Sequence, residues 1–502
     1  MRAYHFAAPA LLLAAVLSGC QRAERYGPRT GRETSSKQTA EDDASDLARS
    51  YPLSPEIQWI DVDNPPRPDV RIEFVHAEKE PEAWRKLTKF WNAPPLTKPG
   101  EAAGVVAMPP LTAGAIVGSA SSGTIQIKVP LGLPDPRDYI PAGETLTLGK
   151  WKLGRQLFFD DTWLEAKTGT SCATCHRPDH GFADQERTHG DGFHSPSLLN
   201  CVFNRWQFWD GRAVLLEEVV QRTLEDERQS NPPKPFRHIW SGVIHRLRNK
   251  ASYHEQFNNV FGTPVGEENG AEKANITQDT VARALASYLR TLLAGDSIHD
   301  RAVEQARKGG SDLKAEHYEA VLDDTDLAEL DRTKSKKSDV AAELMRGYRL
   351  FHGREKNRAL VNCHRCHSGP IFTDNGFHNL GIGYLSRPGQ EGGRFAQVPI
   401  GRKDRYLIDA YKTPSLRNLP RTGPYFHNGS LDRLREVVEF YNHGANANEH
   451  LDPELRGEDG QTRILELSAA EIDALVLFLK ALNGREESAL FQEPSRARSA
   501  AE

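Results

Sequence analysis

The sequence is short of three features whose absence narrows its function. After the first 20 residues, the sequence has no run of the roughly 20 consecutive apolar residues that a membrane-spanning helix needs. Lys and Arg number 64 against 69 for Asp and Glu, which gives a net charge of −5. No basic stripe points to nucleic acid as a partner. Methionine is scarce as well, with 3 in 502 residues.

The first residues have the features of an export signal. Arg2 precedes the apolar run Ala7–Leu17, which ends in Leu17-Ser18-Gly19-Cys20 and is too short to span a membrane. The sequence therefore predicts a lipoprotein signal peptide over residues 1–20, with Cys20 acylated after cleavage. The mature protein is expected on the periplasmic side, held to the membrane by its lipid anchor only. Gln21, in place of an Asp, favours the outer membrane.

Two short motifs carry the chemistry of the chain: Ser171–His176 and Asn362–His367. In each, two cysteines three apart and a histidine directly after the second lie along one side of a helical turn. Two thioether bonds and one iron bond can therefore hold a single haem. The motifs predict two covalently bound haem c groups, held by Cys172, Cys175 and His176 and by Cys363, Cys366 and His367.

Two other readings of these cysteines explain less. A structural zinc site would leave the repeated trailing histidine without a reason, although it uses the same ligand types. A thioredoxin-like CxxC pair needs a βαβ setting, which neither flank provides. The motifs use four of the six cysteines in the chain.

A helix is predicted before each motif, over Thr147–Asp160 and over Val340–Phe351, because apolar residues recur there at helical spacing. A further helix is predicted at Thr277–Leu293. Trp206 is expected to open a helix that runs to about Arg228. The segment Arg301–Ser338 is rich in charge and is predicted to be exposed.

The last predicted helix has the clearest signals at its ends. Ser468 and Glu471 form a capping box, Leu467 and Ile472 are spaced as a hydrophobic staple, and Gly484 lies past the end. The helix-then-motif plan thus occurs twice. It predicts that the second half is an ancient copy of the first.

The fold class predicted from these patterns is mainly α, with two tandem cytochrome c-type haem domains and an N-terminal extension of uncertain fold. The extension includes one predicted strand, Thr124–Val129. The expected boundaries are a signal peptide at 1–20, a disordered tether at 21–50, the extension at 51–129, the N-terminal haem domain at 130–335, the C-terminal haem domain at 336–486 and a tail at 487–502.

The scarcity of methionine bears on the second axial ligand of each iron. Met1, Met108 and Met345 all precede the second motif, and none lies downstream of either motif within its own domain, so an ordinary His/Met centre is not expected. For the second haem, Tyr441 falls on the apolar stripe of a short helix, and His443 and His427 are rival ligands.

For the first haem the ligand stays open between a loop histidine and water. The loop histidines that come into question are His180, His189 and His194. An open or openable iron permits peroxide to bind.

At these residues the sequence resembles the bacterial diheme cytochrome c peroxidase family, including its MauG-type members, which oxidise side chains of a partner protein. The resemblance covers roughly Leu131 to Gly484. The motifs that carry it are Leu153-Gly154-Arg155-Gln156-Leu157-Phe158-Phe159-Asp160, both CxxCH motifs, Phe208-Trp209-Asp210-Gly211-Arg212, Arg290-Thr291-Leu292, Pro414-Ser415-Leu416-Arg417-Asn418 and Pro424-Tyr425-Phe426-His427-Asn428-Gly429.

The resemblance implies that the two haems divide the work. The N-terminal haem would be the peroxidatic centre, and the C-terminal haem would store and pass electrons. Trp209 matches the tryptophan that relays charge between them. Tyr441 matches the tyrosine ligand of MauG-type members, and a phenolate favours ferric iron and lowers the potential.

Some positions depart from the family pattern. The distal glutamate that helps to cleave peroxide falls on Gln229, which cannot shuttle a proton in the same way. A distal glutamine falls on Val219 and a proline on Thr223, while Glu227 is the candidate substitute acid, beside Glu225 and Asp226. His194 stands where the family has a calcium-binding asparagine, which counts against a calcium ion.

The sequence is thus interpreted as a peroxidase-type oxidoreductase that takes hydrogen peroxide as oxidant. Its reductant is expected to be a small cytochrome c or cupredoxin, or an oxidisable partner protein, and the phenolate favours the partner protein. The alternative is a non-enzymatic diheme electron-transfer cytochrome, which Gln229 keeps open. A haem-based sensor that docks through residues 51–129 would bind a partner without turnover.

Overall fold

The computed structural model of the protein describes part of the chain, all of it within the single unit Ser54–Glu502. The described residues are 71–86, 124–164, 170–185, 193–225, 237–262, 275–358, 361–383, 392–457, 459–484 and 486–487. Several predictions lie outside them: the signal peptide with Cys20, the tether, most of the extension, almost all of the tail, and the side chains of His189, Asp226, Glu227 and Gln229. None of the described helices is both long and apolar enough to cross a membrane.

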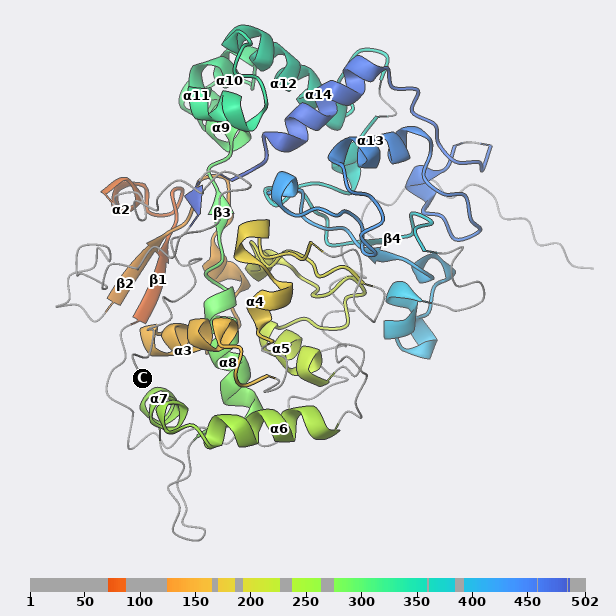
Figure 1. The fold of residues 1–502 in the computed structure, drawn as a ribbon. Coiled ribbons are helices and arrows are strands. Elements are labelled where there is room, and N and C mark those ends of the chain that lie inside the picture. Colours follow the sequence, from red (N-terminus) through yellow and green to blue (C-terminus); the bar gives the residue numbers. More distant parts are fainter. Residues whose placement is uncertain are drawn as a thin grey trace, which may run out of the picture. The chain divides into compact units, whose positions relative to one another are not determined.

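The first haem domain is built on two long helices that touch closely (Figure 1). Helix α3 (Leu148–Phe159) has Thr147 as N-cap and Asp160 as C-cap, which confirms the predicted leading helix. It packs against α8 (Gln278–Leu289), and a Cβ on Gly154 would overlap the carbonyl oxygen of Ala284. The other helices of this domain are α4 (Cys172–Cys175), α5 (Leu216–Glu225), α6 (Arg237–Arg248) and α7 (Ala251–Phe261).

The second haem domain repeats this arrangement. Helix α12 (Lys337–Phe351) packs against α14 (Ala469–Lys480), and a Cβ on Gly347 would overlap the carbonyl oxygen of Ala474. The short helix α13 (Leu434–Asn442) packs on α14. The predicted capping box is present, because the backbone N–H and the hydroxyl of Ser468 both donate to Glu471 at 2.9 and 2.8 Å.

The helix predicted from Trp206 begins only at Leu216, and the prediction was wrong for the residues before it. Phe208 and Gly211 both have left-handed backbone conformations, with φ of 63° and 71°. The side chain of Asp210 accepts a hydrogen bond from the backbone N–H of Arg212 at 3.2 Å. Local side-chain to backbone bonds of this kind compete with helix formation.

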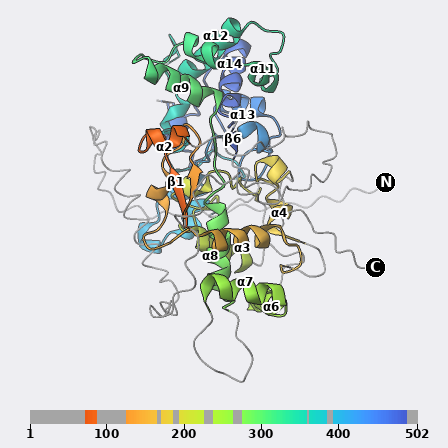
Figure 2. The ribbon, with the colours of Figure 1, turned by 90° about the vertical axis from the view of Figure 1, so that its left-hand side faces the viewer.

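The segment Arg301–Ser338 is not merely exposed charge, and this prediction also needs correction. It contains α9 (Ile298–Lys308), α10 (Ala315–Val321) and α11 (Asp324–Glu329). These helices bury one apolar face each against α12 and α14, and Figures 1 and 2 both show them together. Their buried residues include Ala302, Tyr318, Leu322 and Leu327. Because the outer faces of these helices are charged, the composition of the segment did not indicate its buried apolar residues.

The described part of the N-terminal extension is a small parallel sheet. Strand β1 (Arg71–Val75) pairs with β2 (Thr124–Lys128), so the predicted strand is confirmed. The helix α2 (Pro81–Lys86) follows β1. Apolar residues of both strands pack on Val202 and Phe203 of the first domain and on Ile371 of the second. The remaining short strands pair as β3 (Ala294–Gly295) with β6 (Glu486–Glu487) and β4 (Phe377–His378) with β5 (Tyr411–Lys412).

Candidate haem sites

The first motif occupies one helical turn, α4, and a tight loop fixes its histidine. Nδ1 of His176 donates a hydrogen bond to the carbonyl oxygen of Phe182 at 3.1 Å. Phe182 and Gly181 both have positive φ, of 56° and 60°, which turns this carbonyl toward the ring. Since Nδ1 carries the proton, Nε2 is left with the lone pair that iron requires.

The second motif uses the same device. Nδ1 of His367 donates to the carbonyl oxygen of Phe372 at 3.1 Å, and Phe372 has a φ of 54°. Burial lowers the pKa of His367 to about 4, so the ring is neutral at neutral pH. A neutral, oriented imidazole is what a haem iron binds.

A matched serine supports each of these loops. The hydroxyl of Ser197 donates to the carbonyl oxygen of Gly181 at 2.5 Å, and the hydroxyl of Ser415 donates to that of Ile371 at 2.7 Å. Each acceptor directly precedes the phenylalanine that holds the histidine. The two Pro-Ser-Leu segments therefore have a structural role, because each holds the loop that orients the histidine of its motif.

Three residues after each serine, an asparagine ties the segment to the end of the domain. Asn200 and Asn418 both have left-handed conformations, with φ of 61° and 64°. Oδ1 of Asn200 accepts from the backbone N–H of Ala294 at 2.9 Å, and Oδ1 of Asn418 accepts from that of Gly484 at 2.7 Å. The repeat of contacts supports the prediction that one domain is a copy of the other.

The two copies meet at Trp209 and His427. Each follows a phenylalanine with positive φ, and their rings lie 6.4 Å apart between centroids. The backbone N–H of His194 donates to the carbonyl oxygen of His427 at 2.7 Å, and the backbone N–H of Lys412 donates to that of Trp209 at 2.7 Å. The indole Nε1 of Trp209 donates to the carbonyl oxygen of His194 at 2.7 Å. Trp209 therefore lies at the contact between the domains.

One apolar cavity of about 240 Å³ opens beside the second motif. This volume exceeds by far the roughly 10–15 Å³ that a single water needs. Cys363, Cys366, His367, Tyr441 and Trp209 all line it. No methionine is among the described residues that do so. The apolar side chains around it include Phe351, Ile382, Leu416, Leu434, Val437, Val438 and Leu475.

Tyr441, the predicted ligand of the second haem, lines the cavity from helix α13. Burial raises the pKa of Tyr441 above its usual value, so its hydroxyl keeps its proton unless a cation takes its place. His443 is exposed at the end of α13 and does not line the cavity. His427 lines it, but its ring stacks on Tyr411 at 3.6 Å.

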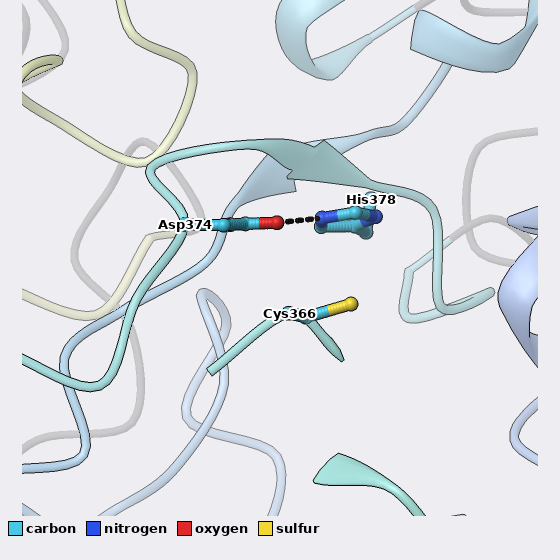
Figure 3. Close-up of side chains that lie close together, drawn as sticks. All are labelled: Cys366, Asp374 and His378. Atoms are coloured by element: carbon cyan, nitrogen blue, oxygen red, sulfur yellow. Dashed lines mark hydrogen bonds and ion pairs between the residues drawn. The ribbon is translucent and has the colours of Figure 1, made fainter. Parts of the chain in front are cut away.

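A second cluster near the motif was not found from the sequence. Nε2 of His378 lies 3.0 Å from a carboxylate oxygen of Asp374, and its Nδ1 lies 2.7 Å from one of Asp452. Figure 3 shows that Cys366 lies beside the Asp374–His378 pair. Burial alone would lower the pKa of His378, but the hydrogen bonds to both carboxylates raise it well above the usual value. The spacing of Asp374 and His378, four residues apart after the motif, was the available signal.

This cluster bears on the alternative that the cysteines form a structural zinc site. Among the residues that the structure describes, Cys366, Asp374 and His378 are the only group with three such ligand atoms within 4.8 Å of one another. The group takes one cysteine from the second motif and neither Cys363 nor His367. Within the described residues, the side chains of neither CxxCH motif form such a group among themselves, and two thioethers and one imidazole per haem fit both motifs.

The loop histidines differ in their surroundings. His194 is buried at 3% exposure beside the domain contact, while Nδ1 of His180 pairs with Asp179 at 3.0 Å and the ring also contacts Gln185. Val219 and Thr223 lie half-buried on α5, and Val219 packs against the core of the first domain. Glu225 ends α5, and burial raises the pKa of its carboxyl group.

Comparison with known proteins agrees with this architecture. The model of the family described as di-haem cytochrome c peroxidase matches residues 149–308. The methylamine utilization protein MauG of Methylophilus methylotrophus is 30% identical over 355 residues, which cover 69% of this chain and 87% of the relative. The cytochrome-c peroxidase IdrP1 of Denitromonas iodatirespirans is 28% identical over 403 residues, which cover 74% and 92%.

A solved structure gives the same fold. The crystal structure of a MauG-like protein associated with microbial copper homeostasis has a TM-score of 0.50 at 23% identity and covers 73% of this chain and 97% of that one. At this identity the likeness concerns the fold alone. With two matched motifs, a duplicated helical plan and a relative of 30% identity along most of its length, the chain belongs to the di-haem cytochrome c peroxidase family and is a peroxidase-type oxidoreductase that uses two haems.

Proposed function

We propose that both haems are of the c type, attached by thioether bonds to Cys172 and Cys175 and to Cys363 and Cys366. The donor sets favour this, since each motif supplies two thiols and one histidine whose Nδ1 already donates elsewhere. Burial raises the pKa of Cys172 and of Cys363 to about 12, so these thiols are not poised as free nucleophiles. When bound, the haem iron supplies the redox chemistry that the side chains lack.

The observation that carries the proposal furthest is the position of Tyr441. Its phenol shares one cavity with His367, Cys363 and Cys366, and no methionine lines that cavity within the described residues. A tyrosine oxygen is a hard ligand that stabilises ferric iron and lowers the potential. We infer that His367 and Tyr441 would both hold the iron of the second haem.

Trp209 is proposed as the group through which the two haems exchange charge. Its ring lines the cavity of the second haem, and its indole N–H is hydrogen-bonded to the backbone of the first domain at His194. That hydrogen bond and the contact with His427 fix the orientation of the ring. The polar group of this half-buried tryptophan is thereby hydrogen-bonded.

The first haem is proposed to receive hydrogen peroxide. Gln229 and Glu227, which fall at and beside the expected distal acid, remain the predicted groups for proton movement during cleavage of the O–O bond. A glutamine can donate and accept hydrogen bonds but cannot change its charge. We therefore expect slower peroxide cleavage than a distal glutamate would give, unless Glu227 takes over.

The proposed reductant is an oxidisable side chain of a partner protein, with a small cytochrome c or a cupredoxin as the other class. A low-potential Tyr-ligated haem is a poor electron store for a soluble donor. The protein would act on the periplasmic side, anchored through a lipid on Cys20. An outer-membrane location is the more specific form of this proposal.

Spectroscopy of the purified holo-protein with peroxide tests the proposal. We expect peroxide to change the absorption of the haems, and peroxide to be consumed when a reducing protein is supplied. Replacing Tyr441 by Phe should raise the potential of the second haem and change its resting EPR spectrum, while both haems stay attached. The reason is that the phenyl ring offers iron no donor atom.

Tyr425→Phe is the matched control. Tyr425 lines the same cavity, but its hydroxyl donates to the carbonyl oxygen of Leu419 at 3.0 Å. Its loss should leave the potential and the spectrum of the second haem unchanged. An unaltered spectrum in Tyr441→Phe would reject Tyr441 as a ligand. A wild-type protein that neither reacts with peroxide nor consumes it with any donor would be an electron carrier and not a peroxidase.

A further inference from the structure

A buried tyrosine and histidine form a hydrogen-bonded pair behind the second haem cavity. Tyr318 on α10 is 0% exposed, and His299 on α9 is 8% exposed. The hydroxyl oxygen of Tyr318 lies 2.8 Å from Nδ1 of His299. The rings of the pair face each other at 28° with centroids 6.1 Å apart. Neither residue belongs to the predicted haem ligands.

The protonation states of the pair are set by burial. Burial lowers the pKa of His299 to about 4, so its ring is neutral at neutral pH. Burial likewise raises the pKa of Tyr318 well above its usual value, so the phenol retains its proton. A neutral imidazole nitrogen accepts a hydrogen bond from a phenol, and 2.8 Å is within the range for direct proton transfer.

Aromatic rings connect the pair to the second haem cavity. The ring of His299 lies 5.3 Å from that of Phe478 and 5.9 Å from that of Phe372. Phe478 lies 5.2 Å from Phe351, which lines the cavity. Phe372 supplies the carbonyl oxygen that holds His367. Phe478 thus links His299 to Phe351 of the cavity wall.

A second row of rings leads from the pair to the haem-binding motif. The ring of Tyr348 lies 5.6 Å from that of His299 and 4.2 Å from that of His352. His352 lies 4.4 Å from His364, which stands between the two cysteines of the motif. This row contains the oxidisable residue Tyr348, so a charge need not cross from the haem to Tyr318 in one step.

We propose that Tyr318 and His299 are a redox site that holds one oxidising equivalent of the second haem as a tyrosyl radical. This inference rests on the proposed function, since the oxidant is the c-type haem after its reaction with peroxide. Tyr318 loses one electron, and the oxidised haem is reduced by that one electron. The phenolic proton moves to Nδ1 of His299, which gives a neutral tyrosyl radical and an imidazolium. An electron from the reducing partner later returns, and the proton moves back.

The surroundings suit this role. The carboxylate of Asp300 follows His299 in the chain and would stabilise an imidazolium, although Asp300 is itself paired with Arg417 at 2.8 Å. The complete burial of Tyr318 would protect a radical from water and from small reductants. The site would keep an oxidising equivalent inside the protein until a partner docks.

The test is EPR of holo-protein frozen shortly after mixing with hydrogen peroxide. Growth on ring-deuterated tyrosine identifies a tyrosyl signal by its narrowing. We expect such a signal in the wild type, its loss in Tyr318→Phe, and its loss or strong reduction in His299→Gln, which keeps an acceptor but no site for the proton. Tyr318→Phe removes a single oxygen atom, so the fold should survive it.

The control is Tyr253→Phe in the first domain. Tyr253 is equally buried at 1% exposure, and its hydroxyl donates to Asp160 at 2.6 Å, but it lies in the core of α3 and α7. Its loss should leave the radical signal intact. If the Tyr318 hydroxyl had only a structural role, Tyr318→Phe would lower stability as Tyr253→Phe does, and the radical signal would persist in both variants.

A second oxidant separates the failure of this inference from that of the proposed function. The same variants are oxidised by a photogenerated ruthenium(III) polypyridyl complex, which needs no peroxide. A Tyr318-dependent radical with ruthenium, in a protein whose haems do not respond to peroxide, would support the site and reject the proposed peroxide chemistry. Haems that respond to peroxide while no Tyr318-dependent radical forms with either oxidant would overturn the inference.

Discussion

At the scale of single residues, the orientation of the two proposed haem ligands is determined by the groups that hold their rings. His176 and His367 each donate to the carbonyl oxygen of a phenylalanine at 3.1 Å. Each phenylalanine has a positive φ, which is costly for a bulky residue and is kept because the loop over-determines it. Part of the backbone strain in the protein thus lies at the two positions that orient the proposed ligands.

His299 leads to a prediction about pH. Its pKa is lowered by burial from 6.5 to about 4, so below pH 6.5 the unfolded chain binds a proton that the folded protein does not. Stability from this group is therefore present above pH 6.5 and is lost as the pH falls toward 4. The full effect is on the order of 3 kcal/mol.

Urea unfolding of the holo-protein at several pH values from about 4.5 to about 7 would measure this dependence. The free energy of unfolding of the wild type should fall more steeply with decreasing pH than that of His299→Gln. Equal slopes would mean that His299 is protonated in the folded protein as readily as in the unfolded chain.

At the scale of elements, the two domains depend on close approach of long helices at a glycine. In each domain the leading helix touches the closing helix where a side chain has no room, at Gly154 and at Gly347. Packing of this density leaves no slack for an added methyl group. The orientation of α12 on α14 in turn sets the wall of the second haem cavity.

Gly347→Ala should therefore destabilise the second domain by about 1–3 kcal/mol, because the new methyl overlaps the backbone of Ala474. Gly242→Ala on α6 is the matched control. There a Cβ meets only the flexible end of Arg246 at 3.0 Å, and the helix gains about 1 kcal/mol of propensity. Thermal unfolding of both variants is the measurement, and a Gly347→Ala protein as stable as wild type would contradict the packing argument.

The helices also show which elements could be predicted from the sequence and which could not. Helix α3 was predicted to within a residue at both ends and α14 at its start, because capping and apolar spacing are local signals. The segment before α5 was not predicted correctly. Its backbone leaves the helical conformation at Phe208 and Gly211, which have positive φ, and at Asp210, whose side chain bonds to the backbone. For α9–α11, charge on the outer faces outweighed the narrow buried stripe.

At the scale of the whole molecule, one buried ion pair joins three distant segments. Arg417 pairs with Asp300 through two hydrogen bonds of 2.8 and 2.9 Å, and both side chains are almost fully buried. The same guanidinium also donates to the carbonyl oxygens of Gly132 and Pro370. It thereby links the start of the first domain, α9 and the loop beside the second haem.

Asp300→Ala should cost about 3–5 kcal/mol of stability, because it leaves a buried guanidinium without its carboxylate. The exposed pair of Arg433 and Glu436 is the comparison: Glu436→Ala should cost under about 1 kcal/mol. Urea midpoints report both. If the two variants lost similar amounts, the buried pair would not be what joins these segments.

The sequence by itself determined the chemistry proposed for this protein, because it contains two motifs suited to hold haem, a tyrosine on an apolar stripe and no methionine downstream of the second motif. These signals are local, because covalent attachment and helix capping need residues only a few positions apart. The tertiary structure decided which distant residues meet. Trp209 lies against His427, Tyr318 reaches His299, and Asp300 neutralises Arg417 only because packed helices bring together segments far apart in the chain. No spacing in the sequence encodes such contacts, since they depend on how the buried surfaces fit.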